Sequence, residues 1–193
     1  MILLHSELKK ELKNKNLIFS DDNPKIGPNS IDVKLGKFLK TYVECKIIDL
    51  KIKDKNYKAI VATETAILDM KQKNKTFTYE IPEEGLVLTP GILYLGYTIE
   101  KAGSTKYVPM YEGRSSLARL GLQSHLSAGF GDIGFKENWT LEIVVVHPLI
   151  IYPNIRIGQV YFLAGKGKIE NLYNGKYNKN NKAKESESFK DFK

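Results

Sequence analysis

The chain has 193 residues, of which 42% are hydrophobic and 10% aromatic, and this composition suffices for one domain with its own core. No apolar run approaches the roughly 18 residues that a membrane-spanning helix needs, and the charged segment 7–11 follows the apolar start too closely for a signal peptide. We therefore expect a cytoplasmic protein without a membrane partner, and its single cysteine, Cys45, excludes an internal disulfide or a thiolate metal cage.

The formal net charge is +8, and half of this surplus comes from residues 166–193, which hold eight lysines and four acids. We treat residues 1–165 as a single domain and residues 166–193 as its basic C-terminal lid or tail. A tail that binds nucleic acid is one interpretation. Because lysine-rich tails are common, we favour a solvated tail or a flap that closes on a small anion, and we expect no nucleic-acid partner.

A short helix is expected near the start of the chain. Ser6 can act as its N-cap, and Leu8 and Leu12 lie four residues apart on one face. The lysines at positions 9, 10, 13 and 15 then face water, which is typical of a helix that packs on the surface of a domain.

From Ile31 onward the sequence has the pattern of β-strands, in which apolar residues alternate or form short runs. The predicted strand segments are 31–35, 75–81, 86–90, 92–100, 139–146 and 155–163. Turn residues separate them at 54–56, 82–85, 89–91, 131–134 and 153–154, a spacing expected of a β-sandwich or barrel. The predicted fold class is mainly β with short helices, and we find no internal repeat.

The segment EGRSSLARLGL (112–122) predicts a second helix over Ser115–Leu120. Ser115 or Ser116 can cap it, and the leucines at 117, 120 and 122 can point into a core. Gly113 allows a close approach of the backbone to a ligand, and a helix start with an arginine and two hydroxyls suits a phosphate. The residues alone equally allow a serine-capped helix with two surface arginines.

With its neighbours, this segment (EGRSSLARLGLQSHLSAGFGDIGFKENWTLE, 112–142) resembles the dCTP deaminase branch of the trimeric dUTPase-like family. The resemblance continues in PNSIDVKLG and IYPNIRIGQVYF, and more weakly in the tail. It implies a dUTPase-like distorted β-barrel or jelly roll that forms a homotrimer, with active sites between subunits. The implied reaction is hydrolysis of dCTP to dUTP and ammonia, in the pathway that supplies dUMP and dTTP. Mg²⁺ would be bound through the nucleotide triphosphate, without zinc.

The residue inventory agrees with a zinc-independent reaction. Zinc nucleobase deaminases need an H-x-E and a P-C-x-x-C motif, and this chain has neither. Water must then be activated by a side-chain base. Glu142 is an acid inside the apolar strand segment WTLEIVVV, where burial would tune its pKa. An outward-facing strand position is the alternative; the resemblance makes Glu142 the catalytic base.

The resemblance also implies roles for the residues of the 112–122 segment. Arg119 would be a buried arginine that keeps Glu142 ionised, and Ser115 would join the same hydrogen-bond network. Arg114 and Ser116 would contact the triphosphate, as would Gln159 from a neighbouring subunit. A surface arginine and an ordinary polar strand residue are the alternatives for Arg119 and Gln159.

The resemblance implies further substrate contacts from residues that precede and follow Glu142 in the sequence. Backbone groups around Ala128 would read the cytosine edge, and Asp132 would bind the deoxyribose 3′-hydroxyl, although an Asp in a Gly-rich turn is most often a turn former. Residues 125–128 match a segment through which relatives respond to dTTP, so dTTP inhibition is a hypothesis. In the tail, Tyr173, Lys176 and Asn180 would fold over the triphosphate.

Three functions remain open from the sequence. The first is a dCTP deaminase that releases dUTP. The second is a bifunctional enzyme that converts dCTP to dUMP and diphosphate; AGF before Asp132 and the run GFKENWTLEIV are similar to such enzymes. The third is a catalytically silent, nucleotide-binding regulatory trimer, which the joint presence of Glu142, Arg119 and Ser115 disfavours.

Overall fold

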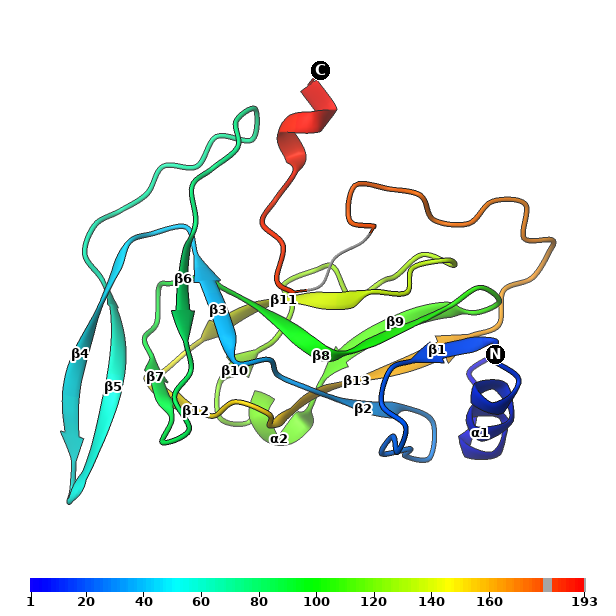
Figure 1. Cartoon of the computed structure of the whole chain (residues 1–193), viewed down its shortest axis with the longest axis horizontal. Coiled ribbons are helices and arrows are strands. Elements are labelled where there is room, and N and C mark those ends of the chain that lie inside the picture. Colours follow the sequence, from blue (N-terminus) through cyan, green and yellow to red (C-terminus); the bar gives the residue numbers. More distant parts are fainter. Residues whose placement is uncertain (179–181, 193) are drawn as a thin grey trace.

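The computed structural model describes residues 1–178 and 182–192, and β-strands form most of it (Figure 1). The helices are α1 (His5–Lys13), the short α2 (Ser115–Ala118) and the 3-10 helix η1 (Ser188–Phe192). The strands are β1 (Leu17–Phe19), β2 (Ile31–Lys34), β3 (Phe38–Thr41), β4 (Cys45–Ile52), β5 (Lys55–Ala62), β6 (Phe77–Glu80), β7 (Leu86–Leu88), β8 (Tyr94–Ser104), β9 (Val108–Gly113), β10 (Leu122–Gln123), β11 (Asn138–Val145), β12 (Leu149–Ile151) and β13 (Arg156–Leu163). The prediction of a mainly β fold is confirmed.

Three sheets make up the fold. The largest has the strand order β10-β11-β8-β3-β6, and β1 also pairs with β8. A second sheet has the order β2-β13-β9, and a third has the order β12-β7-β5-β4. The long strand β8 crosses the middle of the molecule with β11 beside it (Figure 1). Since β8 pairs with β1, β3 and β11, it is the strand against which the position of β11 is set.

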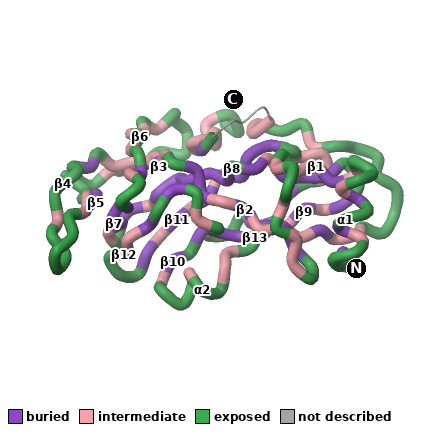
Figure 2. Tube along the Cα trace, turned by 60° about the horizontal axis from the view of Figure 1, so that its bottom comes forward, coloured by how far each residue is buried: buried purple, intermediate pink, exposed green. Residues whose placement is uncertain are grey.

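The main core lies between these sheets, and Leu95, Tyr97 and Ala183 form a second, small cluster. Tyr94, Tyr111 and Phe162 are its largest fully buried side chains, and they come from β8, β9 and β13. In β11 buried and half-buried residues alternate, as expected of a strand with one face on a core. Figure 2 shows the buried stretches concentrated in the central strands. The apolar alternation in the sequence therefore marks the inner faces of the sheets.

The start of α1 differs from the prediction. Its N-cap is Leu4, which has no side-chain capping bond, and Ser6 lies inside the first turn. The chain enters the helix from Leu3, whose N–H donates to Phe162 O (3.0 Å), and the His5 N–H donates to Pro28 O (2.7 Å). The first N–H of the helix, that of His5, is therefore satisfied by a tertiary bond, and the helix begins one residue before Ser6. Leu8 is fully buried, as expected.

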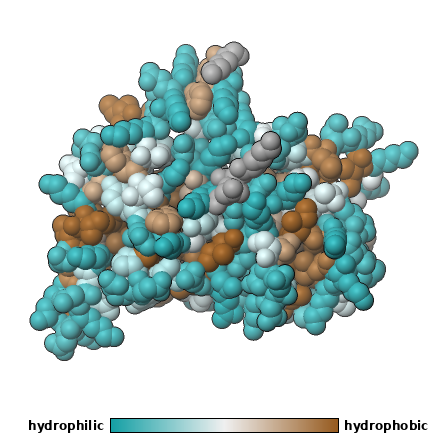
Figure 3. Space-filling view, in the orientation of Figure 1, coloured by the Kyte–Doolittle hydropathy of each residue, from teal (hydrophilic) through white to brown (hydrophobic). Residues whose placement is uncertain are grey.

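All six predicted strand segments contain strands, but β1, β3, β9, β10, β12 and the β4–β5 hairpin were not predicted. The hairpin projects from the body of the molecule (Figure 1), and hydrophilic side chains cover its tip (Figure 3). Most of its residues are exposed, so they lack the alternation that marks a core strand. Within the described residues, no helix combines the length and apolarity required to cross a membrane.

Candidate active site

A cavity of about 540 Å³ opens beside β11 and contains Glu142 on its wall. We call it the Glu142 cavity. Its walls come from β11, from the loop that precedes β11, from the loop between β5 and β6, and from the C-terminal tail. The lining residues used below are Tyr42, Met70, Ala128, Asp132, Phe135, Asn138, Trp139, Thr140, Glu142, Tyr173, Tyr177, Lys184, Ser186 and Ser188.

Glu142 is half-buried, on the side of β11 that faces this cavity. Burial raises the pKa of its carboxyl, because the charged form loses hydration. The Leu126 N–H, which is 3.4 Å from Oε2, and the nearby His125 act in the opposite direction. A carboxylate whose pKa is raised, and which retains a donor, can accept a proton from water near neutral pH.

His125 links the loop before β11 to the segment that precedes α2. Its Nε2 lies 3.3 Å from Glu112 Oε1, and its ring packs edge-on against Tyr111 at 5.5 Å. Nδ1 is buried and, among the described residues, has no hydrogen-bond partner. His125 therefore contacts residues of β9 while its neighbour Leu126 contacts Glu142.

Aromatic rings form the apolar side of the Glu142 cavity. Trp139 stacks on Tyr111 at 6.0 Å, and Phe135 packs edge-on against both Trp139 (5.5 Å) and Tyr173 (5.8 Å). Ala128 and Asp132 line the same cavity. The structure thus brings four of the expected site residues together, since Ala128, Asp132, Glu142 and Tyr173 all face one space.

The C-terminal tail lies over the Glu142 cavity. The Lys184 N–H donates to Thr140 Oγ1 (3.1 Å), and the Ser186 N–H donates to the Tyr42 hydroxyl (2.8 Å). Ser188 Oγ donates to Met70 O (2.9 Å), which joins the tail to the loop between β5 and β6. These bonds hold the tail at three separate points on the cavity rim.

Lys176 does not occupy the position expected of a lid residue. Lys176 is paired with Asp191 and does not line the Glu142 cavity in this chain, whereas Lys184 does. The Lys184 ammonium bonds the Lys176 carbonyl oxygen (2.9 Å) and lies 3.3 Å from the Glu187 carboxylate. Asn180 lies outside the described residues, so its role stays a prediction.

A second group of expected site residues lies elsewhere, at the start of α2. We call Arg114, Ser115, Ser116 and Gln159 the Arg114 cluster. The strand pair β9–β13 brings Gly113 opposite Gly158, one residue before Gln159. Arg114 is 3.3 Å from the Asp32 carboxylate. This cluster does not line the Glu142 cavity.

The start of α2 also differs from the prediction. The N-cap is Arg114, without a side-chain capping bond, so neither Ser115 nor Ser116 caps the helix. The pairing of β9 with β13 continues through Gly113, and the Arg114 carbonyl accepts the N–H groups of Leu117 and Ala118 (3.0 Å each). The helix therefore begins directly after the strand, and both serines are exposed. It ends at Ala118, and Leu120 is 56% exposed instead of lying in the core.

Arg119 was expected to be buried beside Glu142, and within one chain it is not. It is the exposed C-cap residue of α2 and lies outside the lining of the Glu142 cavity. Figures 1 and 2 place α2 and the C-terminal tail on opposite sides of the molecule. A single chain therefore presents the two halves of the expected site on different surfaces.

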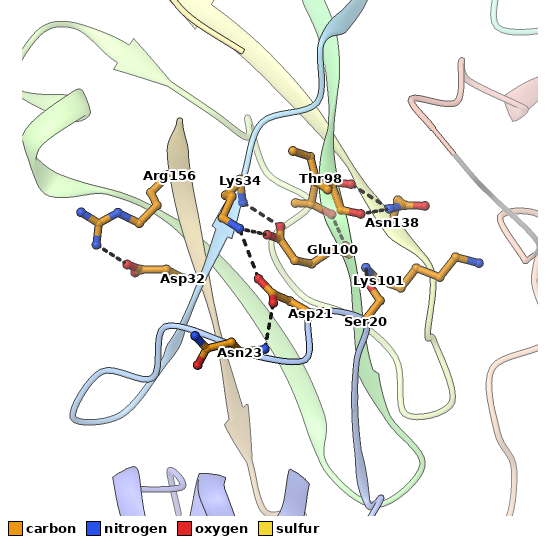
Figure 4. Close-up of polar contacts among 11 residues, drawn as sticks. Ser20, Asp21, Asn23, Asp32, Lys34, Thr98, Glu100, Lys101, Asn138 and Arg156 are labelled. Atoms are coloured by element: carbon orange, nitrogen blue, oxygen red, sulfur yellow. Dashed lines mark hydrogen bonds and ion pairs between the residues drawn. The ribbon is translucent and has the colours of Figure 1, made fainter. Parts of the chain in front are cut away.

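Several site residues were missed by the sequence analysis. Asp32 lies within PNSIDVKLG and bonds both Arg114 and Arg156 (3.0 Å), and the latter contact is visible in Figure 4. Gln159 accepts a hydrogen bond from Ser30 Oγ (2.8 Å). Thr140 could have been found, because it lies two residues before Glu142 and a strand places such residues on one face. Nothing local in the sequence marks Tyr42 as a cavity residue.

The described part of the chain contains no group of three or more His, Cys, Asp or Glu side chains arranged to hold a metal ion. The acids closest to the expected phosphate contacts are otherwise engaged, as Asp32 is with its two arginines.

Comparison with known proteins gives consistent matches. The family model described as "dCTP deaminase-like" matches residues 2–165. A protein of Hathewaya histolytica named "dCTP deaminase, dUMP-forming" is 45% identical over 195 residues, which cover 100% of this chain and 99% of that protein. A protein of Clostridium beijerinckii with the same name is 43% identical over 192 residues, with 100% and 99% coverage.

A solved structure supports the fold. The crystal structure of 2′-deoxycytidine 5′-triphosphate deaminase from Agrobacterium tumefaciens matches with a TM-score of 0.58 and 16% identity, over 85% of this chain and 48% of that one. The present chain thus spans about half the length of that protein, and the likeness concerns the fold alone. Since both the family model and the relatives match nearly the whole sequence, the chain belongs to the dCTP deaminase-like family.

Proposed function

We propose that this protein hydrolyses dCTP to dUMP, ammonia and diphosphate. The placement of Glu142 carries the proposal: a half-buried carboxylate with a raised pKa faces a cavity large enough for a nucleoside. The names of the relatives support dUMP as the product, as do AGF before Asp132 and the run GFKENWTLEIV. Release of dUTP, the first reading of the sequence, becomes the alternative.

In the deamination step, Glu142 accepts a proton from the water that attacks C4 of cytosine. It returns that proton to N3 and then transfers the proton of the new C4 hydroxyl to the amino group, so that the C4–N bond breaks, one water is consumed and one ammonia is released. Backbone groups near Ala128 would hold the base edge, and Asp132 would bind the 3′-hydroxyl. The aromatic wall of Trp139 and Phe135 excludes water from the ring. A second water then cleaves dUTP to dUMP and diphosphate.

The complete site would form between two chains of a homotrimer. Glu142 and Asp132 line a cavity on one surface, whereas Arg114, Ser116 and Gln159 lie on another. Arg119 and Ser115 are exposed in the isolated chain, and a neighbouring subunit would bury them beside Glu142. There the arginine would favour the ionised carboxylate.

Mg²⁺ would be bound through the triphosphate and would neutralise part of its charge. Arg114, Ser116 and Gln159 would supply donors to the phosphate oxygens, since arginine binds phosphate through paired hydrogen bonds. The tail would close the site, with Tyr173 already on the cavity wall and Lys176 released from Asp191 when substrate is bound.

Inhibition by dTTP is part of the proposal. The segment His125–Ala128 contacts Glu142 through Leu126, and through His125 it contacts Glu112, which lies two residues before Arg114. A nucleotide that shifts this segment would change the environment of the Glu142 carboxylate. Adding dTTP should lower turnover of dCTP. Unchanged kinetics at saturating dTTP would refute the proposed inhibition.

The test of the main proposal is a product analysis. The protein is incubated with dCTP and Mg²⁺, and ammonia, dUTP, dUMP and diphosphate are separated over time. Ammonia, dUMP and diphosphate in equal amounts, without accumulation of dUTP, support the proposal. Accumulating dUTP would identify the monofunctional alternative. Tight nucleotide binding without any product would identify a silent regulatory protein.

A further inference from the structure

The pairing of β11 with β8 contains a shift in register close to Glu142. Asn138 is opposite Lys101, but Thr140 is opposite Tyr97. Two residue steps along β11 therefore correspond to four steps along β8, so β8 carries two extra residues between these pairs. Such a bulge bends and twists a strand locally and re-aims the side chains that follow it.

Two buried side chains fill this bulge, Asn138 from β11 and Thr98 from β8 (Figure 4). Asn138 Nδ2 donates to both Thr98 O (2.8 Å) and Ile99 O (2.9 Å). Thr98 Oγ1 donates to Glu100 O (2.8 Å) and accepts the Trp139 N–H (2.9 Å). The backbone groups that the bulge removes from the regular ladder are thus satisfied by these two side chains.

The bulge is also anchored by residues of β2 and of the segment that precedes β2. Glu100, which is 2% exposed, accepts the Lys34 N–H through Oε2 (2.7 Å). The Lys34 ammonium lies 3.5 Å from Glu100 Oε1 and 3.2 Å from Asp21 Oδ2 (Figure 4). The extra residues of β8 are therefore held between β2 and β11, and they cannot slide without leaving buried polar groups unpaired.

The bulge determines which residues of β11 reach the Glu142 cavity. A regular strand presents every second residue to one face, yet the three consecutive residues Asn138, Trp139 and Thr140 all line the cavity. With regular pairing from Asn138 onward, Glu142 would lie opposite Tyr97 instead of Leu95. This two-residue shift keeps the side chain on the same face but moves it by about 6–7 Å along the sheet.

We propose that Asn138 and Thr98 are positioning residues for Glu142. They stabilise the register of β11 that holds the carboxylate beside the Leu126 N–H and within the aromatic wall. The proposal concerns the location of Glu142, and only its kinetic consequence rests on the proposed function. Nothing in the catalytic scheme requires Asn138 or Thr98 to exchange a proton.

The test compares Thr98→Val, which removes the hydroxyl but keeps the shape, with Thr98→Ser, which keeps the hydroxyl. Thr89→Val is the matched control, because Thr89 Oγ1 also donates to a backbone carbonyl, Ile60 O (2.8 Å), but lies outside the lining of the Glu142 cavity. Thermal unfolding is measured for all three variants. Turnover of dCTP and the titration of the Glu142 carboxyl by NMR, assigned with Glu142→Gln, are the further readouts.

We expect Thr98→Val to lower kcat by about 10- to 100-fold with a much smaller change in KM, since small misplacements of a catalytic group cost this much. The midpoint of the Glu142 titration should move towards the ordinary glutamate value as the side chain gains hydration. Thr98→Ser should remain within about twofold of the original kcat, and Thr89→Val should lose stability without losing kcat.

Wild-type kcat and an unchanged Glu142 titration in a destabilised Thr98→Val variant would overturn the proposal, since the bulge would then be structural only. If Thr98→Val does not fold, Asn138→Ser, which retains one donor, is judged by the same criteria. If the unaltered protein does not turn over dCTP, the proposed function fails, but the NMR titration still decides where Glu142 lies.

Discussion

The backbone N–H of Leu126 donates to the Glu142 carboxylate, with 3.4 Å between N and Oε2. This bond joins the loop before β11 to the strand that carries the proposed base. It favours the ionised carboxylate, whereas burial favours the protonated one, and burial is the larger effect on the pKa. Glu142 is therefore held as a base that protonates more readily than an exposed glutamate.

Replacing Glu142 with glutamine should abolish ammonia release while nucleotide binding remains. The amide keeps the shape of the side chain but cannot accept a proton from water, so we expect kcat to fall by about 10²- to 10⁴-fold. Calorimetric titration with dCTP should show affinity within a few-fold of the original. Glu80→Gln, which changes an exposed acid paired with Lys37 at 3.0 Å, is the control. Substantial activity in Glu142→Gln would refute the assigned base.

The pH profile should reflect the pKa of Glu142. The base works only when ionised, so kcat/KM should fall as the pH drops through its pKa. Burial raises this pKa above the ordinary glutamate value of 4.5 in the single chain, and Arg119 of a neighbouring subunit would lower it again in the proposed shared site. Stopped assays across the acid range measure this limb. Enzyme held at each pH and assayed at neutral pH controls for unfolding. A kcat/KM that does not fall anywhere across the acid range, in enzyme that stays folded, would contradict the assignment.

The proposed sharing of each site between two chains of a trimer predicts complementation between inactive variants. Glu142→Gln and Arg119→Ala should each be nearly inactive, because every site then lacks one partner. When the two variants are co-expressed, about one quarter of the sites in randomly mixed trimers should contain both intact residues, and activity should return to that extent. Failure of the mixed trimers to regain activity would mean that both residues act within one chain, or that Arg119 is not needed.

Glu11 should contribute to stability in a pH-dependent way. It is 2% exposed, and although burial opposes its ionisation, Asn16 (2.6 Å) and Lys106 (3.3 Å) outweigh that effect and lower its pKa. A lowered folded-state pKa stabilises the protein fully above the unfolded-state value, and this contribution is lost as the pH falls through the folded-state pKa.

Glu11→Gln should therefore reduce the free energy of unfolding by about 1–3 kcal/mol at neutral pH, and by less in acid. Chemical denaturation at several pH values measures both. Glu7→Gln on the same helix, whose exposed pair with Lys10 spans 3.1 Å, should change it by less than about 0.5 kcal/mol. Equal losses for the two variants would show that the buried pair adds nothing.

The local sequence patterns predicted strands and turns correctly where the chain forms its core. The alternation around Glu142 predicted β11 as a strand, and the structure shows its buried and half-buried residues alternating. Turns with glycine at Gly85 and Gly91 were also found, and both glycines have the positive φ values that these turns require. Local patterns failed for the exposed β4–β5 hairpin, which buries few residues. They also failed for the helix caps, since the N-caps of α1 and α2 are Leu4 and Arg114, neither of which makes a side-chain capping bond.

By itself the sequence determined the mainly β character of this protein, its membership of a recognisable family, and the presence of an acid within an apolar strand. These depend on backbone periodicity and on short motifs, which are local properties of the chain. The tertiary structure alone decided that Arg119 lies apart from Glu142 within one chain, that Lys184 lines the cavity in place of Lys176, and that a bulge sets the register of β11. Such features depend on contacts between residues far apart in the sequence, whose pairing is selected by packing and by the need to satisfy buried polar groups.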